Sequence, residues 1–201
     1  MRIEMKAELP DRVRAMLARV RDLSGLTAYC SGRVSELVRG HLEHEAQGRH
    51  FTARRLGAEP TGFLEDAAAS VVAAPEPRAV VVRVDSPGVK RAYRDIEIRP
   101  KGRFPYLTIP VDAAAYGRRA SSLARATGWR MFQFRSRAGN FLLAARGPDG
   151  LRPLYALKES VPQGRDPSLM PSDEEVGREI AAGAREYIRR QIAGAAGRAT
   201  A

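Results

Sequence analysis

The sequence predicts an α+β fold with N-terminal helices, a mostly antiparallel sheet of about five to six strands, and a C-terminal helix. Apolar residues recur at helical spacing early in the chain, period-2 alternation dominates the middle, and helical spacing returns near the end. We therefore expect a single domain over residues 1–193, followed by a flexible tail. Its parts are a helical region at 28–72, a sheet at 79–160, a helix at 172–193 and the tail at 194–201.

The N-terminal third alternates between one short strand pattern and several helical ones. Residues 2–6 alternate apolar and charged side chains and predict a first strand. Apolar spacing predicts a helix over 10–23 that ends near Gly25, and a second helix over 28–46. Pro60 and Thr61 then provide start signals for a short helix that runs through Ala68.

Strand patterns fill the middle of the chain. Residues 79–84 form a valine-rich strand, and 85–88 have the composition of a turn. Residues 96–111 contain two alternating stretches around a basic turn, which we interpret as a central hairpin. Three further strands near 129–135, 141–145 and 153–158 predict a β-meander. We expect the apolar residues of the hairpin to lie in the core: Ile96, Ile98, Leu107, Ile109 and Val111.

A capping box marks the start of the C-terminal helix. Ser172 and Glu175 have the spacing at which each side chain caps the other residue's backbone N–H. Val176, Ile180 and Ala184 continue as an apolar stripe.

The strongly basic composition favours negatively charged partners. The net charge is +11 and the pI is near 10.6, which favours polyanions or acidic proteins. Most of this charge is arginine, which also fits a GC-rich coding genome, so the charge alone does not indicate DNA binding. Cys30 is the only cysteine, so no internal disulfide forms. No signal peptide or membrane span is predicted, and we expect a soluble protein inside the cell.

No catalytic or metal-binding motif emerges from the chemistry-bearing residues. His41 and His44 lie three residues apart on a predicted helix, with His50 beyond, but HExxH order is absent and a metal needs more ligands. No serine lies in a nucleophile elbow, and Cys30 is interpreted as a packed thiol. We predict no catalytic residues, no cofactor, no metal, and no enzymatic activity. A hydrolase using His41 or His44 is the least favoured alternative.

Basic clusters remain as candidate contact surfaces. Arginines interleaved with aromatic side chains near Trp129, Phe132 and Phe134 are typical of single-stranded nucleic-acid binding. The alternation places Trp129 and Met131 on one face and the two phenylalanines on the other, so at least one set fills the core. A solvated basic face or a protein–protein interface is the favoured interpretation over a base-stacking surface.

A longer set of motifs is similar to a known family. The core motif consists of Ile98–Lys101, Tyr106–Val111 and Ala115–Ala120, and matching downstream stretches are Leu154–Val161, Asp166–Pro167 and Pro171–Glu175. In this order they resemble the phage virion morphogenesis family, the tail-completion proteins of Mu-like prophages. The resemblance covers roughly residues 30–190. Relatives commonly have a glycine pair where this chain has Arg94 and Asp95.

The resemblance implies a structural role. Such proteins complete or terminate the tail and make it competent for head joining. It implies a homo-oligomer, with a ring as one arrangement, and tail-tube and neck or connector proteins as partners. Non-specific contact with DNA in the lumen is a further expectation. It also implies location in the host cytoplasm during assembly and then at the head-proximal end of the virion tail.

We predict interface residues in two basic segments. Arg99, Lys101 and Arg103 occupy the turn between the central strands, and Arg118 and Arg119 follow a glycine downstream. The alternatives are a neck or head-closure connector subunit, and a basic nucleic-acid-binding protein.

Overall fold

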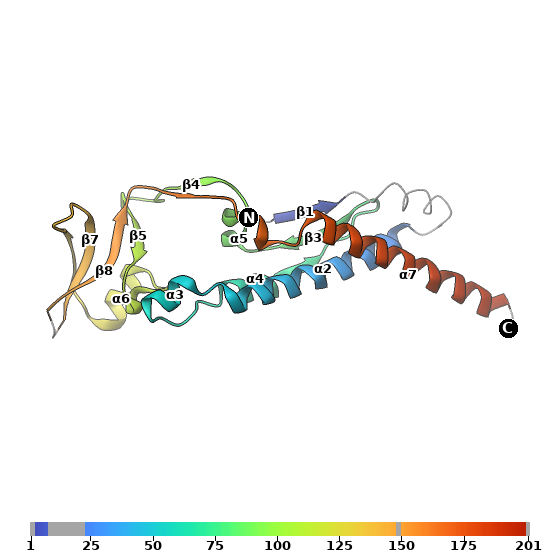
Figure 1. The fold of residues 1–201 in the computed structure, drawn as a ribbon, viewed down its shortest axis with the longest axis horizontal. Helices are drawn as coiled ribbons and strands as arrows, with labels where there is room; N and C mark the ends of the chain where they lie inside the picture. Colours follow the sequence, from blue (N-terminus) through green and yellow to red (C-terminus); the bar gives the residue numbers. More distant parts are fainter. Residues whose placement is uncertain (1–2, 8–22, 148–149, 200–201) are drawn as a thin grey trace. The chain divides into compact units, whose positions relative to one another are not determined.

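The computed structural model describes residues 3–7, 23–147 and 150–199. The described chain is α+β, with helices first, antiparallel sheets in the middle and a long helix at the end, as predicted (Figure 1). Where one domain was expected, the contacts group the chain into two compact units, each built from separate segments. Unit 1 comprises Met1–Gln47, Phe63–Tyr93 and Asp166–Ala201, and unit 2 comprises Gly48–Gly62 and Arg94–Arg165.

Unit 1 contains a three-stranded antiparallel sheet. Its order is β1 (Ile3–Ala7), β3 (Val80–Val84) and β2 (Val71–Ala73), which confirms the two strands predicted at 2–6 and 79–84. The central strand β3 lies between two strands, and it is buried almost throughout because Val80, Val82 and Val84 also pack in the core with the helices of unit 1. The helix predicted over 10–23 falls largely on residues 8–22, which lie outside the described residues.

Helices of unit 1 pack against this sheet. They are α2 (Leu23–Gly48), α4 (Phe63–Ala69), α5 (Pro87–Ala92), the 3₁₀ turn η2 (Pro167–Leu169) and α7 (Asp173–Ala199). The predicted helix over 28–46 is confirmed, but α2 begins at Leu23 and includes Gly25. A glycine inside a helix costs only about 1 kcal/mol, and the burial of Leu26 offsets that cost. The turn expected at 85–88 instead leads into α5.

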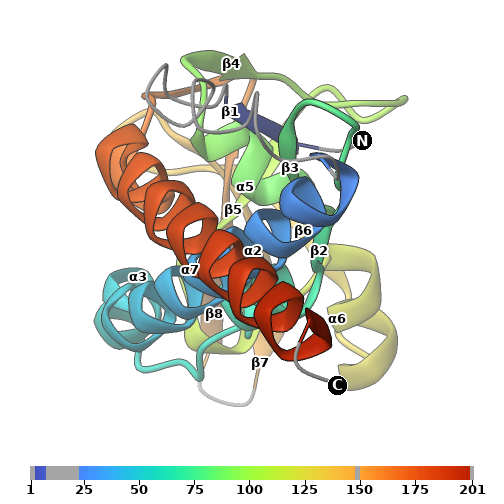
Figure 2. The ribbon, with the colours of Figure 1, turned by 90° about the vertical axis from the view of Figure 1, so that its right-hand side faces the viewer.

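Helix α7 begins as predicted and ends later. The backbone N–H of Glu175 donates to Ser172 Oγ at 3.2 Å, and the Ser172 N–H donates to Glu175 Oε2 at 2.8 Å, which confirms the capping box. The helix continues to Ala199, so the tail predicted at 194–201 is helical over most of its length. Helix α7 runs along α2 (Figure 2), and the fully buried Cys30 and Ile180 lie in the shared core.

Unit 2 is built on a four-stranded antiparallel sheet. The order is β5 (Leu107–Pro110), β8 (Gly150–Lys158), β7 (Phe141–Gly147) and β6 (Met131–Arg135), so the predicted β-meander is confirmed. A separate pair joins β4 (Ile96–Ile98) to β9 (Val161–Gln163). The short helical elements are α3 (Phe51–Leu56), η1 (Ala113–Ala115) and α6 (Ala120–Thr127).

The predicted central hairpin is wrong. Strand β4 pairs with β9 and strand β5 pairs with β8, so the two halves of the 96–111 stretch belong to different sheets. Pro100 and Pro105 in the connecting segment lack the N–H groups that a continuing ladder would need. The core assignment is also wrong, because Ile109 is 38% exposed and Val111 is 41% exposed.

The two faces of the unit 2 sheet differ. One face carries the core, in which Tyr155 and Ala145 pack with Ala115 and Leu123 from η1 and α6. Strand alternation and register place a row of apolar side chains on the other face. In that row Phe134, Leu142, Ala156 and Ile109 are register partners across all four strands. We call this second face, with Phe132 and Leu107 beside the row, the open face.

Candidate interaction surface

The basic turn between β4 and β5 is exposed. Arg99, Lys101 and Arg103 all lie at the surface, and Gly102 adopts a φ of 110°, a conformation that favours glycine. Arg99 Nη2 lies 2.7 Å from Glu97 Oε2 and Arg99 Nε lies 2.9 Å from the same oxygen. The hydrogen bond from the Ser160 side chain, and then that from Arg99, hold the pKa of Glu97 below its ordinary value. The start of the turn is therefore anchored to Glu97 of β4, and Glu97 is bonded in turn to Ser160, the residue before β9.

The second basic segment is held by the core of unit 2. The hydroxyl of the fully buried Tyr155 donates to the backbone carbonyl of Arg118 at 3.0 Å. Gly117 has a φ of 69° and turns the chain before this carbonyl. The side chains of Arg118 and Arg119 are exposed. The buried Tyr155 thus fixes the backbone at Arg118, while the charged side chains of Arg118 and Arg119 face solvent.

An ion pair between the half-buried Asp112 and the exposed Arg152 supports the same region. Asp112 accepts the N–H of Ala114 at 2.8 Å, which caps η1, and binds both Nε and Nη2 of Arg152 at 2.8 Å each. Burial pushes the pKa of Asp112 upward, but the bonds from Arg152 and Ala114 outweigh it and the pKa is lowered. The Arg152 guanidinium lies 5.6 Å from the Trp129 ring centroid. This bidentate pair fixes the start of η1 to β8.

The predicted interface residues therefore occupy two loops of unit 2, one on each side of β5 along the chain. Arg99, Lys101 and Arg103 precede this strand, and Arg118 and Arg119 follow η1. Both loops are exposed and both are anchored, which is the arrangement that a preorganised contact surface requires. Their role as an interface stays a prediction.

Two of the candidate catalytic residues, His41 and Cys30, occupy structural positions. His41 Nε2 lies 2.9 Å from the carbonyl oxygen of Ser168, and His44 is exposed on the same helix. Within the ranges that the structure describes, no group of three potential ligands is placed to hold a metal ion. Cys30 is fully buried, and burial raises the pKa of its thiol to about 11, which disfavours the reactive thiolate.

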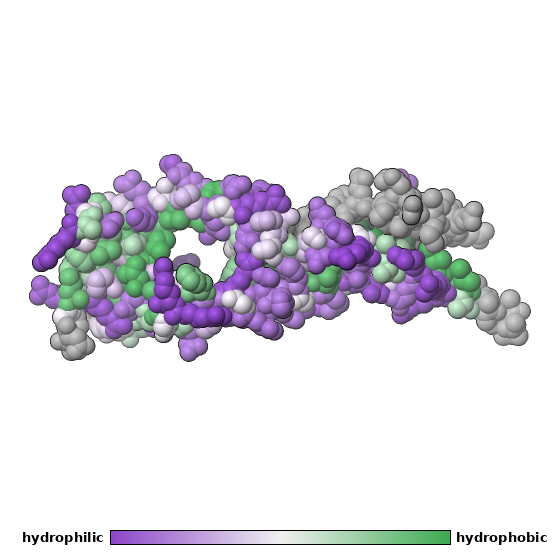
Figure 3. Space-filling view, in the orientation of Figure 1, coloured by the Kyte–Doolittle hydropathy of each residue, from purple (hydrophilic) through white to green (hydrophobic). Residues whose placement is uncertain are grey.

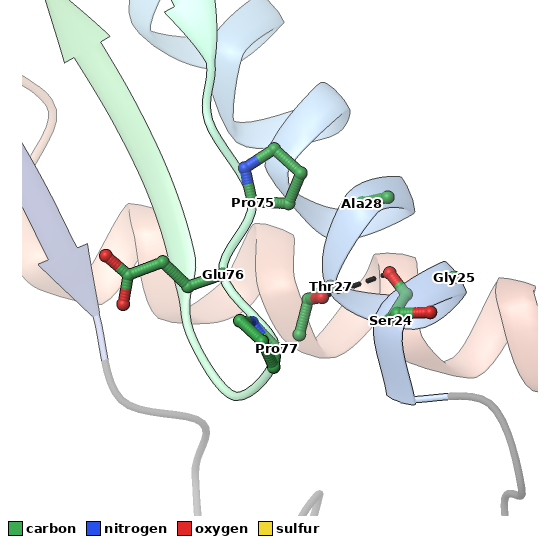
Figure 4. A pocket seen from close by; sticks show the side chains of 7 residues that line it. All are labelled: Ser24, Gly25, Thr27, Ala28, Pro75, Glu76 and Pro77. Carbon is green, nitrogen blue, oxygen red and sulfur yellow. Dashed lines mark hydrogen bonds between the residues drawn. The ribbon is translucent and has the colours of Figure 1, made fainter.

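A pocket of about 420 Å³ lies in unit 1 between the first turns of α2 and the 75–77 turn (Figure 4). Its lining is largely apolar and consists of Ser24, Gly25, Thr27, Ala28, Pro75, Glu76 and Pro77. The Thr27 hydroxyl bonds the Ser24 carbonyl at 3.1 Å, and the Glu76 side chain points away from the α2 residues. This arrangement brings no nucleophile and base together.

Charge is distributed unequally between the two units. Unit 2 contains 17 Lys and Arg against six Asp and Glu, a net charge of +11, whereas unit 1 contains 17 of each. The whole net charge of the protein therefore resides in unit 2. The whole-chain charge of +11 does not show where the charge lies, but the single stretch 94–165 already contains 14 Lys and Arg against five Asp and Glu, a net charge of +9.

The open face carries the two phenylalanines that the sequence pattern placed on the side opposite Trp129 and Met131. Trp129 and Met131 pack against the core under α6, which puts Phe132 and Phe134 on the opposite side of the sheet. Phe132 is 36% exposed, and the ring centroids of Phe132 and Phe134 are 6.4 Å apart. Apolar atoms are visible at the surface of unit 2, flanked by hydrophilic ones (Figure 3). The alternation signalled two faces, but only the packing of α6 and η1 decides which one is covered.

Comparison of the chain with protein-family models, with curated proteins and with solved structures found no match. Of the helices that the structure describes, none is long and apolar enough to cross a membrane.

Proposed function

We propose that this protein is a structural subunit of phage or prophage virion morphogenesis that completes or terminates the tail and makes it competent for head joining. The proposal rests on the motif resemblance over 98–120 and on one structural observation. The basic loops within that motif are exposed and are anchored by Glu97 and Tyr155. An anchored, charged loop loses little conformational entropy when a partner binds, and so suits repeated assembly.

The sheet of unit 2 offers a second means of assembly. Strands β5 and β6 form its two edges and carry backbone groups that a neighbouring chain can pair with. In this role the protein would bind further copies of itself, with a ring as one arrangement. It would also bind tail-tube proteins and neck or connector proteins. A neck or head-closure subunit would use the same surfaces with a different neighbour.

The mass of the purified protein in solution tests the proposal, alone and with the tail-tube protein of the same prophage. We expect a discrete oligomer or a co-complex. Arg99→Glu/Lys101→Glu/Arg103→Glu should abolish it while leaving the thermal unfolding midpoint unchanged. Arg178→Glu/Arg185→Glu/Arg189→Glu, three exposed α7 positions in unit 1, is the matched control and should assemble normally. A monomer that ignores the tail-tube protein at micromolar concentration would overturn the proposal.

A second candidate function, nucleic-acid binding, is favoured by the concentration of charge in unit 2. A compact unit with a charge of +11 attracts the phosphate backbone of DNA or RNA. The two functions are compatible, because a tail subunit can also contact DNA that passes through the virion.

A further inference from the structure

We propose that the open face of unit 2 binds single-stranded nucleic acid, with Phe132 and Phe134 stacking on bases and a basic rim contacting phosphates. This inference rests on the second candidate function, nucleic-acid binding, and adds the site and the class of ligand.

The aromatic pair has the placement that base stacking requires. Phe132 and Phe134 occupy alternate positions of β6, so both rings project from the same side of an edge strand. Their register partners on β7 are the small or aliphatic residues Ala144 and Leu142, and the Phe132 ring is exposed while the Phe134 ring beside it is half-buried. Every base has a π-face, so such a pair accepts bases of any sequence.

Basic side chains border the apolar row. Arg146 on β7 and Lys158 on β8 are exposed, and strand alternation places both on the open face. Arg130, just before β6, lies two residues from Phe132 and so belongs to the same side. No acidic residue occupies an open-face position among the strand residues that the structure describes. Cations around an apolar, aromatic centre complement a strand whose phosphates lie outside its bases.

Composition alone does not account for this charge. A GC-rich coding genome would raise the arginine content of both units, and each unit does contain 17 basic residues. The difference lies in the acidic residues, of which unit 2 has six and unit 1 has 17. The deficit of carboxylates is therefore specific to unit 2 as a whole, and it favours an anionic ligand.

The aromatic residues favour a single strand over a duplex. Bases in a duplex are stacked on one another and expose only their edges in the grooves, so exposed phenylalanine rings have no base face to contact. A single strand presents unstacked bases to a flat platform. A duplex would interact with the basic residues only, and so would gain nothing from Phe132 or Phe134.

Fluorescence anisotropy with a labelled 20-nucleotide single strand and the corresponding duplex tests the inference. We expect tighter binding of the single strand, and a loss of at least about tenfold in Phe132→Leu/Phe134→Leu. Leucine retains the apolar surface and removes the π-face. Phe104→Leu is the matched control, because Phe104 is exposed in the same unit but packs with Tyr106 away from the open face. That control should bind like the unmodified protein.

The salt dependence tests the rim separately. In Arg130→Gln/Arg146→Gln/Lys158→Gln the slope of log affinity against log salt concentration should become shallower by about two, since each phosphate contact on a single strand contributes about 0.7. Substitution of the α7 arginines Arg178 and Arg185 should leave the slope unchanged.

Three other results would overturn the inference in distinguishable ways. Equal affinity for both ligands, unaffected by the phenylalanine substitutions, would leave charge-driven binding intact and remove the open face from it. No binding of either ligand at low salt would remove the second candidate function as well. Loss of co-assembly with tail-tube protein in Phe132→Leu/Phe134→Leu, with nucleic-acid binding intact, would assign the face to a protein partner.

Discussion

The hydroxyl of Tyr155, at the centre of the unit 2 core, holds the backbone carbonyl of Arg118 at 3.0 Å. Tyr155→Phe removes this bond and leaves a part-buried carbonyl without its donor. We expect a loss of about 1 kcal/mol in the free energy of unfolding and faster amide hydrogen exchange at residues 117–120. Tyr106→Phe, in the same unit, should change neither quantity. Unaltered exchange in Tyr155→Phe would show that the loop is held by other contacts.

The Asp112–Arg152 pair should make the stability of unit 2 sensitive to acid. The folded-state pKa of Asp112 lies below its unfolded value of 3.8, so its contribution is present above that pH and is lost as the pH falls through the lowered pKa. Asp112→Asn should cost about 1 kcal/mol at neutral pH and flatten the loss of stability below about pH 4. Urea unfolding across this range measures both. Glu36→Gln, which breaks an exposed pair with Arg39, should leave the pH profile unchanged.

Gly88 should resist substitution only while Phe63 is present. A Cβ at Gly88 would lie 2.2 Å from Cε2 of the Phe63 ring, so Gly88→Ala must displace that ring. Because the Phe63 ring is 39% exposed and can swing aside, we expect a cost of at most about 1 kcal/mol in the unmodified protein and no cost in a Phe63→Ala background, as measured by a double-mutant cycle in urea. Gly177→Ala in α7 meets no atom within 4 Å and should stabilise by up to about 1 kcal/mol. Additive effects at 63 and 88 would contradict the contact.

Cys30 should be unreactive in the folded protein. Its thiol pKa of about 11 lowers the thiolate fraction at pH 8 by roughly a hundredfold relative to an ordinary cysteine, and its side chain is fully buried. Labelling by a thiol reagent should therefore follow the opening of the α2–α7 contact and become fast in urea. Cys30→Ala/Ser121→Cys, which places a thiol at an exposed α6 position, should react at once. Rapid labelling of native Cys30 would contradict the packing.

Local patterns predicted individual elements well, and their partners less well. The spacing of Ser172 and Glu175 predicted a capping box that the structure contains, because a cap depends only on neighbouring residues. Ile96 and Ile98 do lie in a strand, but its partner is Val161–Gln163 rather than the adjacent 107–111 stretch. Strand pairing depends on residues distant in sequence, and alternation alone does not specify them.

The candidate surfaces illustrate the same limit of local information. Exposure of Arg99 and Lys101 followed from the turn chemistry of their segment. The exposure of Phe132 depended on α6 and η1 covering the other side of its strand, which the alternation of residues 131–135 does not by itself decide. The charge of unit 2 lies mostly in the single stretch 94–165, whose net charge is +9, but only the fold shows that this stretch and residues 48–62 form one compact unit.

The point at which the chain leaves and re-enters unit 1 has a consequence for how this protein can diverge. The Asp166 N–H donates to the Ala92 carbonyl at 2.8 Å, so both ends of the 94–165 segment meet at the last residue of α5. From the standpoint of unit 1 this segment is an insertion with closed ends, and doubling the length of such a loop adds only about 0.6 kcal/mol to its closure. Residues can be gained, lost or exchanged between 94 and 165 with little thermodynamic effect on unit 1. The 94–165 segment, which carries most of the positive charge, is therefore the part of the chain free to adapt to new partners.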